Sequence, residues 1–162
     1  MSKKNITINN HSVNLFEDIR GEFYEINATL TVNEAEEIGF KLRKGSENEI
    51  DVKLSDFNQQ NNTIKVTIDA TKSGKYGGEN NSIVVKVKDN KITIRIIVDT
   101  NLIEVYLNEG EASLFAVAYP EPDNTDIELY VIDGKTEINN IDMYTLKSIW
   151  GEIKKSSINP FM

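Results

Sequence analysis

The sequence predicts an all-β protein, a two-sheet antiparallel β-sandwich of the jelly-roll or lectin-like type. Apolar and polar residues alternate along about ten to twelve short segments, which is the pattern of strands that bury one face. Turn-forming residues separate these segments roughly every eight to twelve residues, a spacing typical of sandwiches and barrels. No segment shows a long helical repeat. The 162 residues suffice for one domain around a shared apolar core.

The clearest strands lie in the stretch 92–120, which predicts three consecutive antiparallel strands. Isoleucine stands at every second position from 92 to 96, with polar residues between. The next two segments continue this period of two, and turns at 99–101 and 108–111 separate them. Gly110 allows a positive φ in the second turn. The rest of the chain is expected to pair with or pack against this meander.

Further strands are predicted on both sides of that stretch, at 23–32, 38–44, 50–57, 63–69, 83–87, 127–132 and 135–146. Asp133-Gly134 is a strong hairpin-turn signal between the last two. Residues 15–21 are interpreted as a single helical turn that ends at Gly21. The predicted organisation is a flexible polar leader at 1–14, the sandwich module at 15–150 and a loose tail at 151–162.

The composition argues against several classes of partner. The net charge is −8 and the isoelectric point about 4.8, whereas nucleic acids and anionic membranes require a basic face. The chain has no cysteine, which excludes disulfides and cysteine metal sites. No apolar run approaches the ~20 residues that cross a membrane, and no signal-peptide pattern is present. The localisation stays open, because a cytosolic protein and a piece of a larger, secreted protein both fit.

No catalytic or cofactor motif is recognisable. The 26 Asp and Glu residues include the carboxylates that glycoside hydrolysis needs, but no motif places two of them in a cleft. His11 is the single histidine and is expected at the surface, so no nucleophile–base pair follows. The glycines at 74, 77 and 78 lack the spacing of a phosphate loop, and the acidic turn 123–126 lacks that of a calcium loop. No metal or cofactor is predicted.

Several segments, taken in order, resemble one family. They are 40–45 (FKLRKG), 69–74 (DATKSG), 94–112 (IRIIVDTNLIEVYLNEGEA) and 144–150 (YTLKSIW). Together they make residues 15–150 similar to the C-terminal β-sandwich module of glycoside hydrolase family 32, the family of invertases, sucrose-6-phosphate hydrolases, levanases and inulinases. The closing LKSIW is the most specific piece of the resemblance.

The resemblance implies a sandwich that follows a five-bladed catalytic propeller, which holds the nucleophile, the transition-state stabiliser and the acid/base. The propeller motifs, of the type WMNDP, RDP and EC, are absent from this chain, whose one tryptophan is Trp150. No hydrolase activity is therefore expected from the chain by itself. The chain also departs from the family pattern, since Ala70 and Thr100 stand where the family often has arginine.

Three hypotheses about function follow from these observations. In the first, the module braces a catalytic propeller, in the same chain or a separate one, or mediates oligomerisation, with Trp150 at the interface. In the second, it recognises the terminal fructose of levan or related fructans, as the similar family 66 carbohydrate-binding modules do. The predicted sugar-binding residues are Arg43, Asp69, Tyr76, Glu104 and Tyr106, for which a solvated sheet face is the alternative interpretation. The third, an enzyme, is disfavoured.

Overall fold

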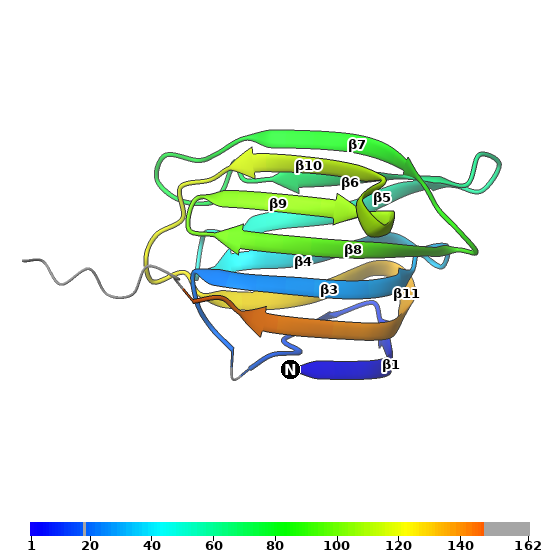
Figure 1. Cartoon of the computed structure of the whole chain (residues 1–162), viewed down its shortest axis with the longest axis horizontal. Coiled ribbons are helices and arrows are strands. Elements are labelled where there is room, and N and C mark those ends of the chain that lie inside the picture. Colours follow the sequence, from blue (N-terminus) through cyan, green and yellow to red (C-terminus); the bar gives the residue numbers. More distant parts are fainter. Residues whose placement is uncertain (18, 148–162) are drawn as a thin grey trace, which may run out of the picture.

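The computed structural model describes residues 1–17 and 19–147, in which strands and one short 3-10 turn, η1, make up the regular structure (Figure 1). The strands pair antiparallel, so the predicted all-β class is confirmed. In chain order the elements are β1 (Ser2–Asn9), β2 (Ser12–Val13), β3 (Phe23–Thr31), β4 (Ala35–Lys44), β5 (Ile50–Asn58), β6 (Thr63–Asp69), β7 (Asn80–Lys86), β8 (Lys91–Asp99), β9 (Leu102–Leu107), η1 (Asn108–Gly110), β10 (Ala112–Val117) and β11 (Asp126–Thr145).

The strands form two layers that face each other (Figure 1). Sheet A has the order β10-β9-β8-β3-β11-β1, and sheet B has the order β2-β11-β4-β5-β6-β7. The predicted meander is confirmed as β8, β9 and β10, with Val105 opposite both Ile96 and Leu114. The layers also meet at one edge, where the side-chain amide of Asn81 on β7 donates to the Phe115 carbonyl of β10 at 2.7 Å. The result is a sandwich that is nearly closed along that edge.

One strand, β11, belongs to both sheets. Its first half pairs with β4 and its second half with β3, and the chain bends between them at Asp133 and Gly134. The sequence predicts a hairpin turn here, and that prediction is wrong, because both halves continue in one direction from one layer into the other. Gly134 is required at the bend, since its φ is +145° and a Cβ there would lie 1.9 Å from the Glu34 carbonyl oxygen.

The core lies between the layers and comes from the inward positions of the period-two pattern. Alternate residues of β3, β8 and β9 are almost fully buried, and the inward residues of β4, β5 and β6 face them. Branched aliphatic side chains dominate, with Phe16, Tyr24 and Phe40 as the large aromatic members. Because each layer buries one face of branched side chains against the other, the hydrophobic effect fixes the strand register as well as the fold.

The first 14 residues are not a flexible leader. Residues 2–9 form β1, an edge strand of sheet A that places Ile8 opposite Thr136 and buries it in the core. Asn5 has a φ of +54°, so the strand is kinked in its middle and its alternation is hard to read from the sequence. Residues 15–17 form a turn in which the Ile19 amide donates to the Phe16 carbonyl. The predicted tail at 151–162 lies outside the described residues.

None of the helical segments in the described part of the chain is long and apolar enough to span a membrane.

Candidate functional site

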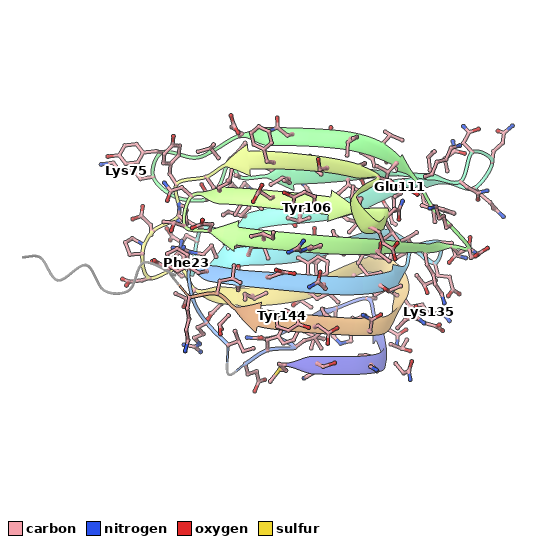
Figure 2. The ribbon with its side chains drawn as sticks, in the orientation of Figure 1. Phe23, Lys75, Tyr106, Glu111, Lys135 and Tyr144 are labelled. Atoms are coloured by element: carbon pink, nitrogen blue, oxygen red, sulfur yellow. The ribbon has the colours of Figure 1, made fainter. Side chains whose placement is uncertain are left out.

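The outer face of sheet A carries a strip of apolar side chains near the edge where β3 begins and β11 ends. The strand registers align these residues across five strands. Phe23, Phe115 and Tyr144 are each about half exposed or more, at 45%, 61% and 52%; Figure 2 labels two of them. The apolar strip consists of Phe23, Ile97, Leu102, Phe115, Val117, Tyr144 and Leu146. Contiguous exposed apolar side chains of this kind mark interaction surfaces more often than ordinary solvated ones.

Three acidic residues lie among these side chains. Glu25 and Glu104 are bound by polar residues beside the strip, whereas Asp99 is exposed between Phe23 and Leu102. The Arg95 guanidinium donates to both carboxylate oxygens of Glu25, at 2.8 and 3.0 Å. This bidentate contact holds the pKa of Glu25 below its ordinary value. The Tyr106 hydroxyl donates to Glu104 at 3.0 Å and lies on the same side of the strip. The strip therefore carries less uncompensated charge than its sequence suggests.

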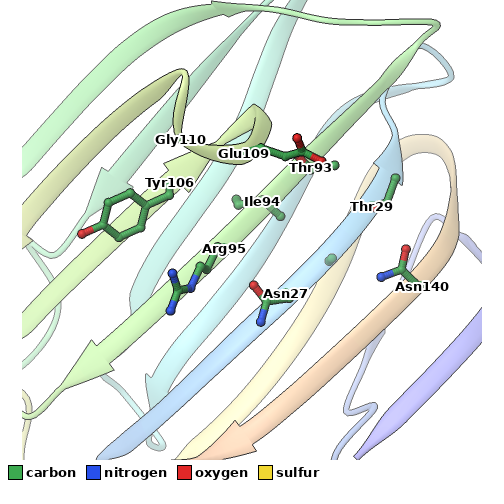
Figure 3. Close-up of a pocket in the computed structure, with 10 residues that line it drawn as sticks. Asn27, Thr29, Thr93, Ile94, Arg95, Tyr106, Glu109, Gly110 and Asn140 are labelled. Carbon is green, nitrogen blue, oxygen red and sulfur yellow. The ribbon is translucent and has the colours of Figure 1, made fainter.

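Beside the strip, η1 overhangs a groove of about 310 Å³, which we call the η1 groove (Figure 3). Its floor is the outward face of β8, β3 and β11, with Tyr106 at one end and Asn140 at the other (Figure 3). The other side chains that face it are mostly uncharged and polar. The lining residues used below are Asn27, Thr29, Thr93, Arg95, Tyr106 and Asn140, with Glu109 and Gly110 on the overhanging turn.

The overhang has an unusual backbone. Asn108, Glu109 and Gly110 all have positive φ, at 49°, 59° and 91°. Left-handed conformations cost roughly 1 kcal/mol for a non-glycine residue, so something must hold the turn in place. The Asn108 side-chain amide supplies this by donating to the Lys86 carbonyl at 2.7 Å. The turn thus overhangs the sheet in a fixed position.

Under the overhang, the Thr93 hydroxyl is buried and has no hydrogen-bond partner. Thr93 lines both the η1 groove and a second hollow of about 260 Å³, which Lys88, Asn108 and Glu109 also line. An unsatisfied buried hydroxyl costs about 1–3 kcal/mol, which a bound polar group would recover.

Sheet B carries a different arrangement on its outer face, a pair of carboxylates joined by a tyrosine. The Tyr130 hydroxyl lies 2.6 Å from Glu37 and 2.9 Å from Asp51. The Tyr130 ring lies over Gly39, where a Cβ would come within 2.4 Å of it. Burial raises the pKa of Asp51 to about 6. One hydroxyl proton cannot satisfy two ionised carboxylates, so the cluster favours a proton on Asp51.

This pair lines a hollow of about 300 Å³ with His11 and Lys41, but the geometry does not suit glycoside hydrolysis. A hydrolase needs the scissile bond between its two carboxylates. Here the Tyr130 phenol occupies that place, because its ring packs directly on Gly39. The cluster therefore fastens β11 to β4 and β5 without room for a glycosidic oxygen.

The family profile described as "Glycosyl hydrolases family 32 C terminal" matches residues 1–145 of the chain. The chain belongs to this family. A levanase of Bacillus subtilis is 29% identical over 156 residues, covering 91% of this chain and 22% of the levanase. A fructan beta-fructosidase of Streptococcus mutans is 27% identical over 163 residues, covering 97% of this chain and 11% of that protein. This family 32 C-terminal domain thus spans about a fifth or less of these relatives.

Solved structures show the same fold at low sequence identity. Exo-inulinase from Aspergillus awamori superposes with a TM-score of 0.72 at 20% identity, over 91% of this chain and 29% of that chain. Fructan 1-exohydrolase IIa from Cichorium intybus gives 0.72 at 13% identity, over 91% of this chain and 35% of that one. Both comparisons establish the β-sandwich architecture of the domain.

The structure separates the five predicted sugar-binding residues. Only Glu104 and Tyr106 meet, through their hydrogen bond on sheet A. Asp69 lies on sheet B, where it accepts hydrogen bonds from Thr71 and pairs with Lys53 at 3.6 Å. Tyr76 is 77% exposed on the loop after β6, with the Lys75 ammonium over its ring.

Arg43, predicted as a sugar-binding residue, does not lie on a solvated sheet face, which was the alternative interpretation, because its side chain is 1% exposed. Its φ is +47°, and the pairing of β4 with β11 gains an extra residue on β4 there, a β-bulge that turns the side chain inward. The guanidinium donates to the carbonyls of Asn124 and Glu121 at 2.8 and 3.2 Å. Arg43 therefore secures the loop between β10 and β11.

Sequence reasoning missed Asn27, Thr93, Arg95 and Asn140 in the η1 groove. Each occupies an outward position of a predicted strand, where the period-two pattern indicates only contact with solvent. The signal that was available is the positive-φ turn signature Asn-Glu-Gly above them. The predicted interface residue Trp150 lies outside the described residues.

Proposed function

We propose that this chain is the accessory β-sandwich of a fructan- or sucrose-hydrolysing enzyme, that it lacks hydrolase activity of its own, and that it braces a catalytic propeller. The apolar strip carries this proposal. It places exposed aromatic and aliphatic side chains on the surface of a protein with a net charge of −8, and two of its three acids, Glu25 and Glu104, are bound by neighbouring residues. A hydrophobic centre with a polar rim is the composition of a stable interface.

The ends of the described chain lie next to the strip. The Met1 amino group donates to the Met143 carbonyl at 2.7 Å, one residue from Tyr144. The Leu146 amide donates to the Phe23 carbonyl, so the chain leaves sheet A within the strip. The first residue of the described chain therefore lies close to the apolar strip. The relatives are several times longer than this chain, which supports a covalently attached domain as the partner.

A chimera tests the bracing role. The matching segment of the Bacillus subtilis levanase is replaced by this chain, with the native sequence or with Phe115→Asp in the strip. We expect the native chimera to be soluble and to release fructose from levan, and the Phe115→Asp chimera to unfold at a lower temperature and lose activity. Val84→Asp is the matched control, because Val84 is 63% exposed on β7 of sheet B, outside the strip.

Equal behaviour of the two variants would show that the strip is not the docking surface. Light scattering of the chain alone distinguishes bracing from self-association, since a dimer that Phe115→Asp dissolves would assign the strip to oligomerisation. The purified chain is expected to release no fructose from sucrose or levan.

A further inference from the structure

We infer that the η1 groove binds one neutral, polyhydroxylated ring, that is, a single sugar unit, on the outer face of sheet A. This site is distinct from the apolar strip and does not depend on docking. Four properties of the groove support it: its chemistry, its charge, its fixed shape and an unsatisfied hydroxyl.

The chemistry of the lining matches a ligand that both donates and accepts hydrogen bonds. Asn27, Asn140 and Thr29 contribute amide and hydroxyl groups from two neighbouring strands. The Asn27 amide nitrogen donates to Glu25 at 2.7 Å, which fixes the orientation of the side chain and leaves its carbonyl oxygen outside that bond. Sugar hydroxyls are the ligand groups that use mixed donors and acceptors of this kind.

The charge of the lining argues against an anionic ligand. Arg95 is the one cation in the lining, and its Nε and Nη2 atoms bind Glu25 at 2.8 and 3.0 Å. Glu109 adds a carboxylate on the overhang. With the arginine neutralised and an acid above it, the groove repels phosphate or carboxylate groups and favours an uncharged molecule.

The shape is fixed and small. The groove volume of about 310 Å³ is at the lower end of ligand sites, which suits a single ring more than a chain of them. The Tyr106 ring closes one end and is held by its hydroxyl contact with Glu104 and by Arg95, whose guanidinium lies 5.9 Å from the ring centroid. An aromatic wall beside hydroxyl-binding groups supplies the apolar contact that sugar C–H groups require.

The Thr93 hydroxyl gives the sharpest test, because it is buried under the overhang with no partner. Thr93→Val keeps the shape and removes the hydroxyl. Thr67→Val, on the outward face of β6, is the matched control away from the groove. Amide NMR spectra of the full chain are recorded with D-fructose, sucrose and a levan oligosaccharide, and with gluconate and inorganic phosphate as anionic probes.

We expect the neutral sugars to shift the amides of residues 27–29, 93–95 and 106–110. Loss of one buried hydrogen bond should weaken binding about tenfold in Thr93→Val and leave Thr67→Val unchanged. Asn140→Leu, a second groove variant, should weaken binding similarly. Phe115→Asp should bind sugar normally, which separates this site from the docking role.

Three results would overturn the inference: no amide shifts in the groove with any sugar, shifts confined to another surface, or binding that Thr93→Val and Asn140→Leu both leave intact. Preference for gluconate or phosphate over the neutral sugars would also reject the ligand class.

Discussion

The outer faces of the two sheets expose different kinds of side chains to solvent. On sheet B, lysines pair with acids. Lys41 contacts Glu49, which directly precedes β5, at 2.7 Å, and Lys44 on β4 contacts Glu128 on β11 at 3.2 Å. On sheet A, apolar side chains share the face with a polar groove that contains an unpartnered hydroxyl. A face whose charges satisfy one another gains little from a partner, whereas sheet A leaves groups for one.

The largest expected effect tests how tightly sheet B is fastened. Gly39→Ala puts a methyl group 2.4 Å from the Tyr130 ring, which must move and lose its contacts with Glu37 and Asp51. We expect the free energy of unfolding in urea to fall by about 3 kcal/mol. Gly110→Ala on the sheet A overhang meets no atom within 4 Å and should cost about 1 kcal/mol, from its φ of +91° alone. Equal costs would show that the ring moves freely.

The next effect is the pH dependence of the sheet B cluster. The pKa of Asp51 is raised from 3.8 to about 6 in the folded state, so the folded protein binds this proton more tightly than the unfolded chain does. The stability that this proton contributes is fully present below about pH 4. It is lost as the pH rises through about 6, and the loss is on the order of 2 kcal/mol. Thermal unfolding of the wild type and Asp51→Asn from pH 4 to 7 measures it. Asp51→Asn should be more stable than the wild type at pH 7 but not at pH 4.

A smaller effect is expected at the ion pair on sheet A. The pKa of Glu25 is lowered by Arg95, so its contribution is present above the unfolded pKa and is lost as the pH falls through the folded value. Arg95 is 51% exposed, and solvent therefore reduces the effect of Glu25→Gln to about 0.5 kcal/mol. Urea unfolding at low salt measures the loss. In about 1 M NaCl the loss should disappear, because salt screens the ion pair. Glu111→Gln, in the exposed pair with Lys88, is the control and should change nothing measurable.

The smallest effect separates the two faces by surface chemistry and not by stability. Phe115→Asp on sheet A and Val84→Asp on sheet B should each change the free energy of unfolding of the isolated chain by less than about 0.5 kcal/mol. Only Phe115→Asp should clearly shorten retention on a hydrophobic-interaction column, because Phe115 belongs to a contiguous strip. Equal shortening by both substitutions would mean that the strip has no special character.

Alternation along the strands was enough to predict most of the fold. It places the inward residues of β3, β8 and β9 correctly, because each strand buries one face and exposes the other. It fails where one residue leaves the alternation. Asn5 hides β1, and the bulge at Arg43 moves a side chain from the predicted outer face into the interior. Positive φ at a non-glycine residue has little sequence signature, so these breaks were not predictable.

The candidate site was less predictable than the fold, because it is defined by proximity across strands. Asn27, Thr93 and Asn140 are distant in the sequence, and only the register of β8, β3 and β11 brings them together. Glu104 and Tyr106 were predictable as a pair because they are two positions apart on one strand. Asp133-Gly134 shows the reverse error, since a strong local turn signal gives way to the pairing of β11 with both layers.

Membership of β11 in both layers has a consequence for biosynthesis. Between β3 and β1 in one layer, and between β4 and β2 in the other, β11 fills an interior place, yet it is the last strand of the described chain to leave the ribosome. While it is still in the exit tunnel, both halves of the nascent protein keep open hydrogen-bonding edges. The final twenty-residue strand thus closes both open edges at once. If translation stops before β11 is made, the released product is prone to aggregation.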